Sequence, residues 1–139
     1  MASLASLFLD TAGWFAALAP PEKGHAIARR TYAEAARAGQ LLVTTTFVVA
    51  EMHTLLLRWR DARAGRQFLD AVFESGVHMI APVDGELVEA AIARWIRGYA
   101  DQSFSLCDAI SFEVMRRERI ARALTFDNHF SVAGFATLR

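Results

Sequence analysis

The sequence predicts a single α/β domain over residues 1–139, with a mostly parallel central sheet of about four to five strands flanked by helices. Short apolar runs alternate along the chain with longer segments whose apolar residues recur at helical spacing. Runs that are apolar throughout are typical of strands buried on both faces of a parallel sheet. A chain of 139 residues that is 54% hydrophobic is long enough for one hydrophobic core.

In the first half of the chain, residues that favour turns separate the elements. A buried strand is predicted over 4–9, and the helix after it is stopped by Pro20-Pro21. Gly39 and Gly76 end two further helices. The elements predicted after the first strand are helices at 11–18, 22–38, 47–59 and 62–74, with a second strand at 41–44.

The second half of the chain continues the alternation. The apolar run 77–81 is closed by Pro82 and predicts a third strand, and the run 121–126 predicts a fourth. A short fifth strand is predicted at 135–138. Helical periodicity predicts two more helices, at 87–99 and 106–117.

Charge and cysteine content limit the classes of function. Fifteen basic residues balance fifteen acidic ones, so no strong overall field attracts nucleic acid, and RNA binding would need local patches. The single cysteine, Cys107, excludes an internal disulfide and a cysteine zinc cluster and fits a reducing compartment. No apolar stretch approaches the roughly 20 residues of a membrane span, and the N-terminal run lacks a signal-peptide pattern. We therefore expect a cytoplasmic protein without a membrane span.

Two aspartates lie where predicted strands end. Asp10 follows the first strand, and Asp127 follows the fourth. In open parallel sheets, ligands bind in the crevice at the carboxyl ends of the strands. Each aspartate also has a purely structural interpretation, since Asp10 is placed to cap the next helix and Asp127 begins a turn-like run.

A third carboxylate, Glu51, lies on a predicted helix among apolar neighbours. It is in one row with Phe47 and Leu55 at a spacing of four, so its carboxylate is expected to be desolvated. A desolvated carboxylate needs an arginine, a proton or a metal as its partner. Arg58 and Arg60 are expected to point to other faces of this helix, which favours a functional role for Glu51.

A fourth carboxylate, Asp108, has two interpretations. Its position three residues after Ser105 matches a capping box. It also shares a helical face with Phe104 and Phe112, so it is expected to point inward. Asp101, in the loop before this helix, is a weaker candidate.

The four carboxylates together indicate a metal site. If they converge, each pair at ~4 Å repels by about 4 kcal/mol at an effective dielectric of ~20, so bound cations or shared protons are required. An all-oxygen site suits Mg²⁺, with Mn²⁺ as a substitute, and not zinc. Such a site would activate water for attack on a phosphodiester. The predicted catalytic residues and metal ligands are Asp10, Glu51, Asp108 and Asp127.

Four segments around these acids resemble a known family. They are Phe8-Leu9-Asp10-Thr11, the run 44–51, the run 99–109 and the run 123–130, which is followed by Gly134-Phe135. With this spacing, the chain resembles the PIN-domain ribonucleases nearly end to end, in particular those that serve as VapC toxins of bacterial toxin–antitoxin pairs. The fourth segment and the spacing of the acids are the specific part of the resemblance.

The resemblance implies a PIN-like fold with the four acids in one cleft. It also implies Mg²⁺- or Mn²⁺-dependent endoribonuclease activity, an antitoxin partner and a homodimer. Beside the acids, the hydroxyls of Thr11 and Thr125 either orient carboxylates and waters or simply pack at strand ends. Asp101 is a further candidate for such a supporting role.

RNA binding would require positive charge near the cleft. Arginines cluster in sequence at 58–66 and at 116–122, where they either contact phosphates or form a solvated helix surface. The four histidines are scattered without zinc-ligand spacing. Of these, His129 lies near Asp127, but a surface turn is the favoured interpretation.

Three alternatives remain open from the sequence. The first is an RNA-processing PIN nuclease without a toxin role. The second is aspartyl-phosphate chemistry with Asp10 as nucleophile, which leaves Glu51 unexplained and lacks a nearby lysine, since Lys23 is the only one. The third is a non-catalytic α/β binding module whose acids cap helices and pair with arginines.

Overall fold

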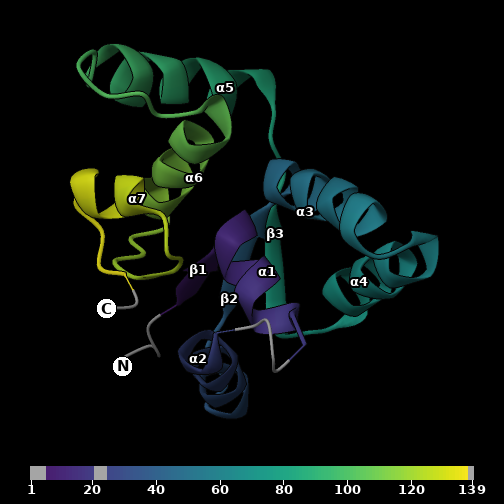
Figure 1. Ribbon diagram of the computed structural model, residues 1–139. Helices are drawn as coiled ribbons and strands as arrows, with labels where there is room; N and C mark the ends of the chain where they lie inside the picture. Colours follow the sequence, from purple (N-terminus) through teal and green to yellow (C-terminus); the bar gives the residue numbers. More distant parts are fainter. Residues whose placement is uncertain (1–5, 21–24, 138–139) are drawn as a thin grey trace.

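The computed structural model describes residues 6–20 and 25–137 and has the α/β architecture that the sequence predicts (Figure 1). Four strands form one sheet in the order β3-β2-β1-β4, and every pairing is parallel. The strands are β1 (Leu7–Leu9), β2 (Leu42–Thr45), β3 (His78–Ala81) and β4 (Ala123–Leu124). Parts of three predicted elements, at 4–5, 22–24 and 138, lie outside the described residues.

The central strands are apolar because both of their faces are covered. Phe8 in β1 is fully buried and pairs in register with Val43 on one side and with Ala123 on the other. In Figure 1, α3 and α4 lie on one side of the strands, and α6 and α7 lie on the opposite side. The sheet is therefore the centre of the hydrophobic core.

Five helices agree closely with the predictions. Each begins after a residue in extended conformation, and in four of them the side chain of that residue accepts a backbone N–H of the first turn. These helices are α1 (Thr11–Leu18), α2 (Ala26–Arg37), α3 (Thr46–Trp59), α4 (Ala62–Glu74) and α6 (Leu106–Arg117).

Four elements differ from the predictions. The helix predicted at 87–99 is observed as α5 (Gly85–Ala91) followed by the π-helix η1 (Ile92–Arg97). The strand predicted at 121–126 is reduced to β4, and the fifth strand is reduced to a single bridge between Arg122 and Ala136. The turn expected after Asp127 is a short helix, α7 (Asn128–Val132), that Asp127 caps. The apolar pattern could not distinguish bridges and π turns from regular elements.

A buried ion-pair network occupies the middle of α6. The Glu113 side chain is 1% exposed, and its carboxylate accepts hydrogen bonds from the Trp95 indole and from the guanidinium groups of Arg116 and Arg117. Burial raises the pKa of Glu113, but these hydrogen bonds outweigh burial and lower it to about 2. Two of the arginines considered for RNA binding are thus engaged in this network, and Arg117 also pairs with Glu86.

The first turn of α1 lies against the backbone of β4. A Cβ atom added at Gly13 would lie 1.8 Å from the carbonyl oxygen of Leu124, so only glycine allows this approach. The contact fixes where Asp10, the residue that caps α1, lies relative to the end of β4.

Within residues 6–20 and 25–137, no helix has the length and apolar composition needed to cross a membrane.

We predict that Gly13→Ala strongly destabilises the protein, because α1 must move away from β4 to make room for the methyl group. Chemical denaturation of the purified variant measures the change, expected to be at least about 1–3 kcal/mol. Gly85→Ala is the matched control, since nothing lies within 4 Å of its added Cβ in the first turn of α5. Equal stability of Gly13→Ala and the wild type would contradict the close packing of α1 on β4.

Candidate active site

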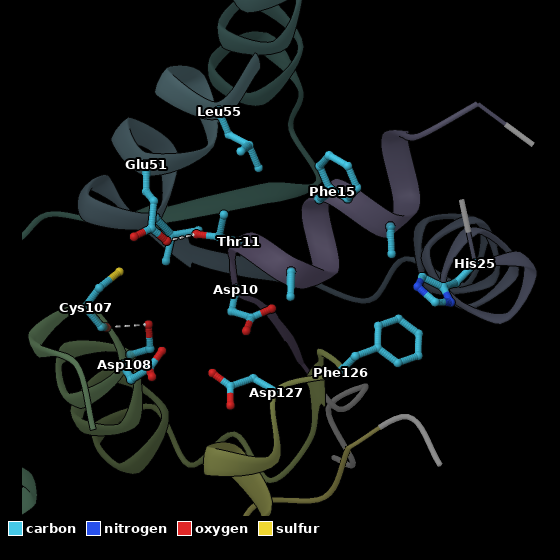
Figure 2. Close-up of a pocket in the computed structure, with 14 residues that line it drawn as sticks. Asp10, Thr11, Phe15, His25, Glu51, Leu55, Cys107, Asp108, Phe126 and Asp127 are labelled. Carbon is cyan, nitrogen blue, oxygen red and sulfur yellow. Dashed lines mark hydrogen bonds between the residues drawn. The ribbon is translucent and has the colours of Figure 1, made fainter. Parts of the chain in front are cut away.

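A pocket of about 500 Å³ opens at the carboxyl ends of β1 and β4. Its lining includes all four acidic residues singled out from the sequence (Figure 2). They come from four places in the chain: Asp10 follows β1, Glu51 lies on α3, Asp108 lies on α6, and Asp127 follows β4. The tertiary fold therefore brings together carboxylates that are up to 117 residues apart in sequence.

Asp10 is the most deeply buried of the four, at 5% exposure. One carboxylate oxygen accepts the Gly13 N–H at 2.7 Å, so Asp10 caps α1, and the other accepts the Thr125 hydroxyl at 2.6 Å. Burial is nevertheless the largest effect and raises the pKa of Asp10 to about 7. The hydrogen bonds from Thr125 and Gly13 lower this pKa, and the charges of Asp108 and Asp127 raise it by smaller amounts. Asp10 therefore caps α1 and also lies in the acidic pocket, so the structural and the functional interpretation both hold for its position.

Thr125 connects the two strand-end aspartates. Its side chain is fully buried and donates to Asp10, while its oxygen accepts the backbone N–H of Asp127 at 2.9 Å. The hydroxyl thus orients a carboxylate instead of merely packing at the end of a strand. It supports the position of both aspartates.

Asp108 and Asp127 face each other across the pocket, and each is partly buried. The Asp108 N–H donates to the Ser105 hydroxyl at 3.0 Å, so the predicted cap of α6 is present. Burial raises the pKa of Asp108, and the charge of Asp127 adds to that effect. The Asp127 carboxylate accepts the backbone N–H of His129 at 2.9 Å.

His129 belongs to this cluster, although the sequence favoured a surface turn. Its Nδ1 lies 3.5 Å from an Asp108 oxygen and 3.7 Å from an Asp127 oxygen. One ligand atom from each of the three side chains lies within 4.8 Å of the others. The missed signal was the two-residue spacing in Asp127-Asn128-His129, which in the first turn of α7 brings the imidazole back toward its capping carboxylate.

Glu51 lies at the rim of the pocket and is exposed, so the expectation that it is desolvated was wrong. The row that contains it also carries Phe47, which is 40% exposed, because this stripe of α3 faces the pocket mouth and not the core. The Thr11 hydroxyl donates a hydrogen bond to the Glu51 carboxylate. Arg58 lies two turns after Glu51 on α3 and lines a shallow pocket together with Glu51 and with Thr11 of α1. Arg58 and Glu51 are therefore on the same side of α3, contrary to the expectation from the sequence.

Two further residues of the third sequence segment have different surroundings. Asp101 is exposed, lies 3.5 Å from the Gln102 amide nitrogen, and is outside the pocket. Cys107 does line the pocket, where burial and the charges of Glu51, Asp108 and Asp10 raise the pKa of its thiol to about 12. A thiol that stays neutral is a poor metal ligand.

The arrangement fits a hard divalent cation. Among the described residues, the ion-pair partner of Asp108 and Asp127 is His129, and no arginine or lysine pairs with Asp10. Burial raises the pKa of Asp10 and of Asp108, and the charge of Asp127 adds to both increases. The three carboxylates supply oxygen ligands of the kind that Mg²⁺ and Mn²⁺ prefer.

Comparison with known proteins identifies the family. Residues 7–136 match the PIN domain family. The chain is 33% identical over 133 residues to the 23S rRNA-specific endonuclease VapC20 of Mycobacterium tuberculosis. The aligned residues cover 96% of this chain and 98% of that protein.

Solved structures agree with this result. The crystal structure of Mycobacterium tuberculosis VapC20, a sarcin-ricin loop cleaving toxin, matches with a TM-score of 0.80 and 34% identity over 96% of this chain and 99% of that one. FitAcB from Neisseria gonorrhoeae matches at 0.69 with 19% identity over 96% of both chains. VapBC2 from Rickettsia felis, bound to a promoter DNA fragment, matches with a TM-score of 0.67 and 11% identity over 95% of this chain and 96% of that one. The matches to FitAcB and VapBC2 show the shared fold. This chain therefore belongs to the PIN-domain family and is a homologue of the endonuclease toxin VapC20.

Proposed function

We propose that this protein is a metal-dependent endoribonuclease that hydrolyses RNA phosphodiester bonds and acts as the toxin of a type II toxin–antitoxin pair. The observation that carries the proposal is the cluster of Asp10, Asp108 and Asp127 in one pocket, which no arginine or lysine among the described residues lines. Full-length similarity to an endonuclease toxin supports the same reaction.

In this proposal Asp10, Asp108 and Asp127 hold Mg²⁺, or Mn²⁺ in its place, and Glu51 completes the site from the rim. A divalent cation held there supplies a Lewis acid for the scissile phosphate and for the attacking water. The chain's own residues orient the ligands, since Thr125 hydrogen-bonds to Asp10 and Thr11 hydrogen-bonds to Glu51. Hydrolysis by water would leave a 5′-phosphate and a 3′-hydroxyl.

Ribosomal RNA is the proposed substrate class, because the relative that matches over nearly the whole chain is named as 23S rRNA-specific. Arg58 is the arginine best placed to meet the phosphate backbone, since it is exposed and lines the shallow pocket beside Glu51. Arginine neutralises phosphates and positions the strand without reading its sequence.

An antitoxin protein, a homodimeric state and a cytoplasmic location complete the proposal. The antitoxin is supported by the match over nearly the whole chain to a protein named as a toxin, whereas the homodimer and the location rest on the family resemblance. A PIN nuclease with a role in RNA maturation would use the same site and would differ in lacking an antitoxin.

The first prediction tests the nuclease itself. The purified protein should cleave ribosomal RNA in Mg²⁺ or Mn²⁺ but not in EDTA, and Asp10→Asn should lower the rate by more than about 100-fold, since even supporting residues of metal sites cost about 10–100-fold. Gel analysis with end-group mapping measures rate and product. Cleavage by Asp10→Asn at the wild-type rate, or a 2′,3′-cyclic product, would sink the proposed site.

The second prediction concerns the metal-free protein. The folded-state pKa of Asp10 is about 7 and its unfolded value is 3.8, so between these values the folded protein binds a proton that the unfolded chain does not. Stability in EDTA should therefore fall as pH rises from about 4 to 7, by up to about 4 kcal/mol from this residue.

Asp10→Asn should remove this loss and be more stable than the wild type at pH 8. Urea titrations at pH 5 and pH 8 measure the difference. Asp70→Asn, an exposed substitution on α4, is the control. If Asp10→Asn were less stable than the wild type at pH 8, the burial of a charged Asp10 carboxylate would not be the dominant cost.

The third prediction tests Arg58. In the inactive Asp10→Asn background, Arg58→Ala should weaken RNA binding and reduce the slope of log K against log [salt] by about 1, as expected for one phosphate contact. Arg66→Ala, exposed on α4 and outside the pocket, should leave the slope unchanged. Equal slopes for the two variants would remove Arg58 from the RNA interface.

A further inference from the structure

The active-site pocket has two chemically different halves (Figure 2). The carboxylates gather in one half, where a cation would be held. The other half is lined by the aromatic rings of Phe15, His25 and Phe126, and the PIN-type reaction described above assigns no role to them.

The aromatic half is attached to the same elements as the acidic half. Phe126 immediately precedes Asp127, so their Cα atoms are ~3.8 Å apart. Phe15 lies one helical turn after Thr11 on α1, so both side chains project on the same side of that helix. Anything that contacts these rings is therefore next to the proposed metal ligands.

The rings are held in place but are not part of the closed core. Phe15 and Phe126 are partly exposed and pack against the core from its edge. Phe15 contacts Trp59 at a centroid distance of 4.7 Å, and Phe126 contacts His25 at 4.3 Å with 31° between the rings. The side chains of Phe15, His25 and Phe126 all line the pocket.

The charges of the pocket leave little else to bind RNA there. Among the residues that the structure describes, the lining contains four carboxylates and no arginine or lysine, so without a cation these residues repel phosphate. Affinity for a nucleotide in the aromatic half must come from an uncharged surface. A pocket of about 500 Å³ is in the size range of small-ligand sites.

We propose that Phe15, Phe126 and His25 form a subsite for one unpaired nucleobase that flanks the scissile phosphate. This inference rests on the proposed nuclease function and names the residues that would hold the base. Bases that are splayed out of single-stranded loops stack on aromatic rings, and such stacking tolerates any base. His25 is exposed and its ring nitrogens make no hydrogen bond to a residue that the structure describes, so they are open to a base edge.

The subsite restricts the RNA that can be cut. A base within a regular A-form duplex is stacked and paired, so it cannot enter a lateral pocket without being extruded. The protein should therefore cleave next to an unpaired or extruded nucleotide in a loop, and it should leave continuous duplex intact.

The first experiment is independent of cleavage and of metal. The wild-type protein in EDTA is titrated with adenosine, uridine and ribose, and amide shifts are followed by two-dimensional NMR. Both nucleosides should give saturable shifts near Phe15 and Phe126, and ribose should give none. Phe126→Leu, which keeps apolar volume but removes the ring, should weaken nucleoside binding by at least about 5-fold.

Phe73→Leu is the matched control, because Phe73 is 61% exposed on α4 and outside the pocket. It should bind nucleosides as the wild type does. Equal shifts with ribose and nucleosides, or wild-type affinity in Phe126→Leu, would overturn the subsite.

The second experiment uses an RNA whose cleavage site has been mapped, with an abasic nucleotide placed on either side of the scissile bond. For the wild type, one of the two abasic substitutions should lower kcat/KM by roughly 5- to 150-fold, the range expected for loss of one stacked base. Phe126→Leu should cut the intact RNA with a similar loss and show no further loss with that abasic RNA.

The outcomes separate the two proposals. If the wild type cleaves RNA but neither abasic substitution matters, or if Phe126→Leu remains as sensitive as the wild type, the nuclease stands and the subsite is rejected. If no RNA is cleaved in Mg²⁺ or Mn²⁺, the nuclease proposal fails, and the nucleoside titration alone decides whether the aromatic half binds bases.

Discussion

The close packing of α1 on β4 at Gly13 is the constraint on which the site depends. It places the cap of α1 at the end of two neighbouring strands, so that Asp10 reaches the Gly13 N–H and the Thr125 hydroxyl at once. The two hydrogen bonds hold a carboxylate in a position where burial makes its charge unfavourable. The fold thus maintains a strained electrostatic arrangement with ordinary capping and strand-end contacts.

Helix α6 shows how differently one element can treat two carboxylates. Glu113, near its middle, is buried among arginines and an indole that satisfy its charge, and its pKa is low. Asp108, in the first turn, faces other carboxylates and a histidine, and its pKa is raised. The first is a structural ion pair, whereas the second gains from a cation. Counter-charge, more than burial itself, distinguishes the two roles.

The two halves of the pocket suit the two parts of a nucleotide. In the proposed reaction, the carboxylates and a cation would act on the phosphate, and the aromatic rings would offer a surface for the base. Both halves are built on α1 and on the segment after β4, so the alignment of phosphate and base depends on the same close contact at Gly13. Arg58 at the rim adds positive charge outside the acidic region, where it does not compete with the cation for the carboxylates.

Local sequence determined the first three strands, five of the helices and the four acidic positions, because apolar periodicity and caps are short-range properties. What lies beside each acid was decided by tertiary structure. The exposure of Glu51 depends on where α3 meets the pocket rim, and the contact of His129 with Asp108 joins two helices that no local pattern relates. The aromatic half of the pocket likewise arises only when α1 and the segment after β4 come together, since burial and charge are fixed by neighbours distant in sequence.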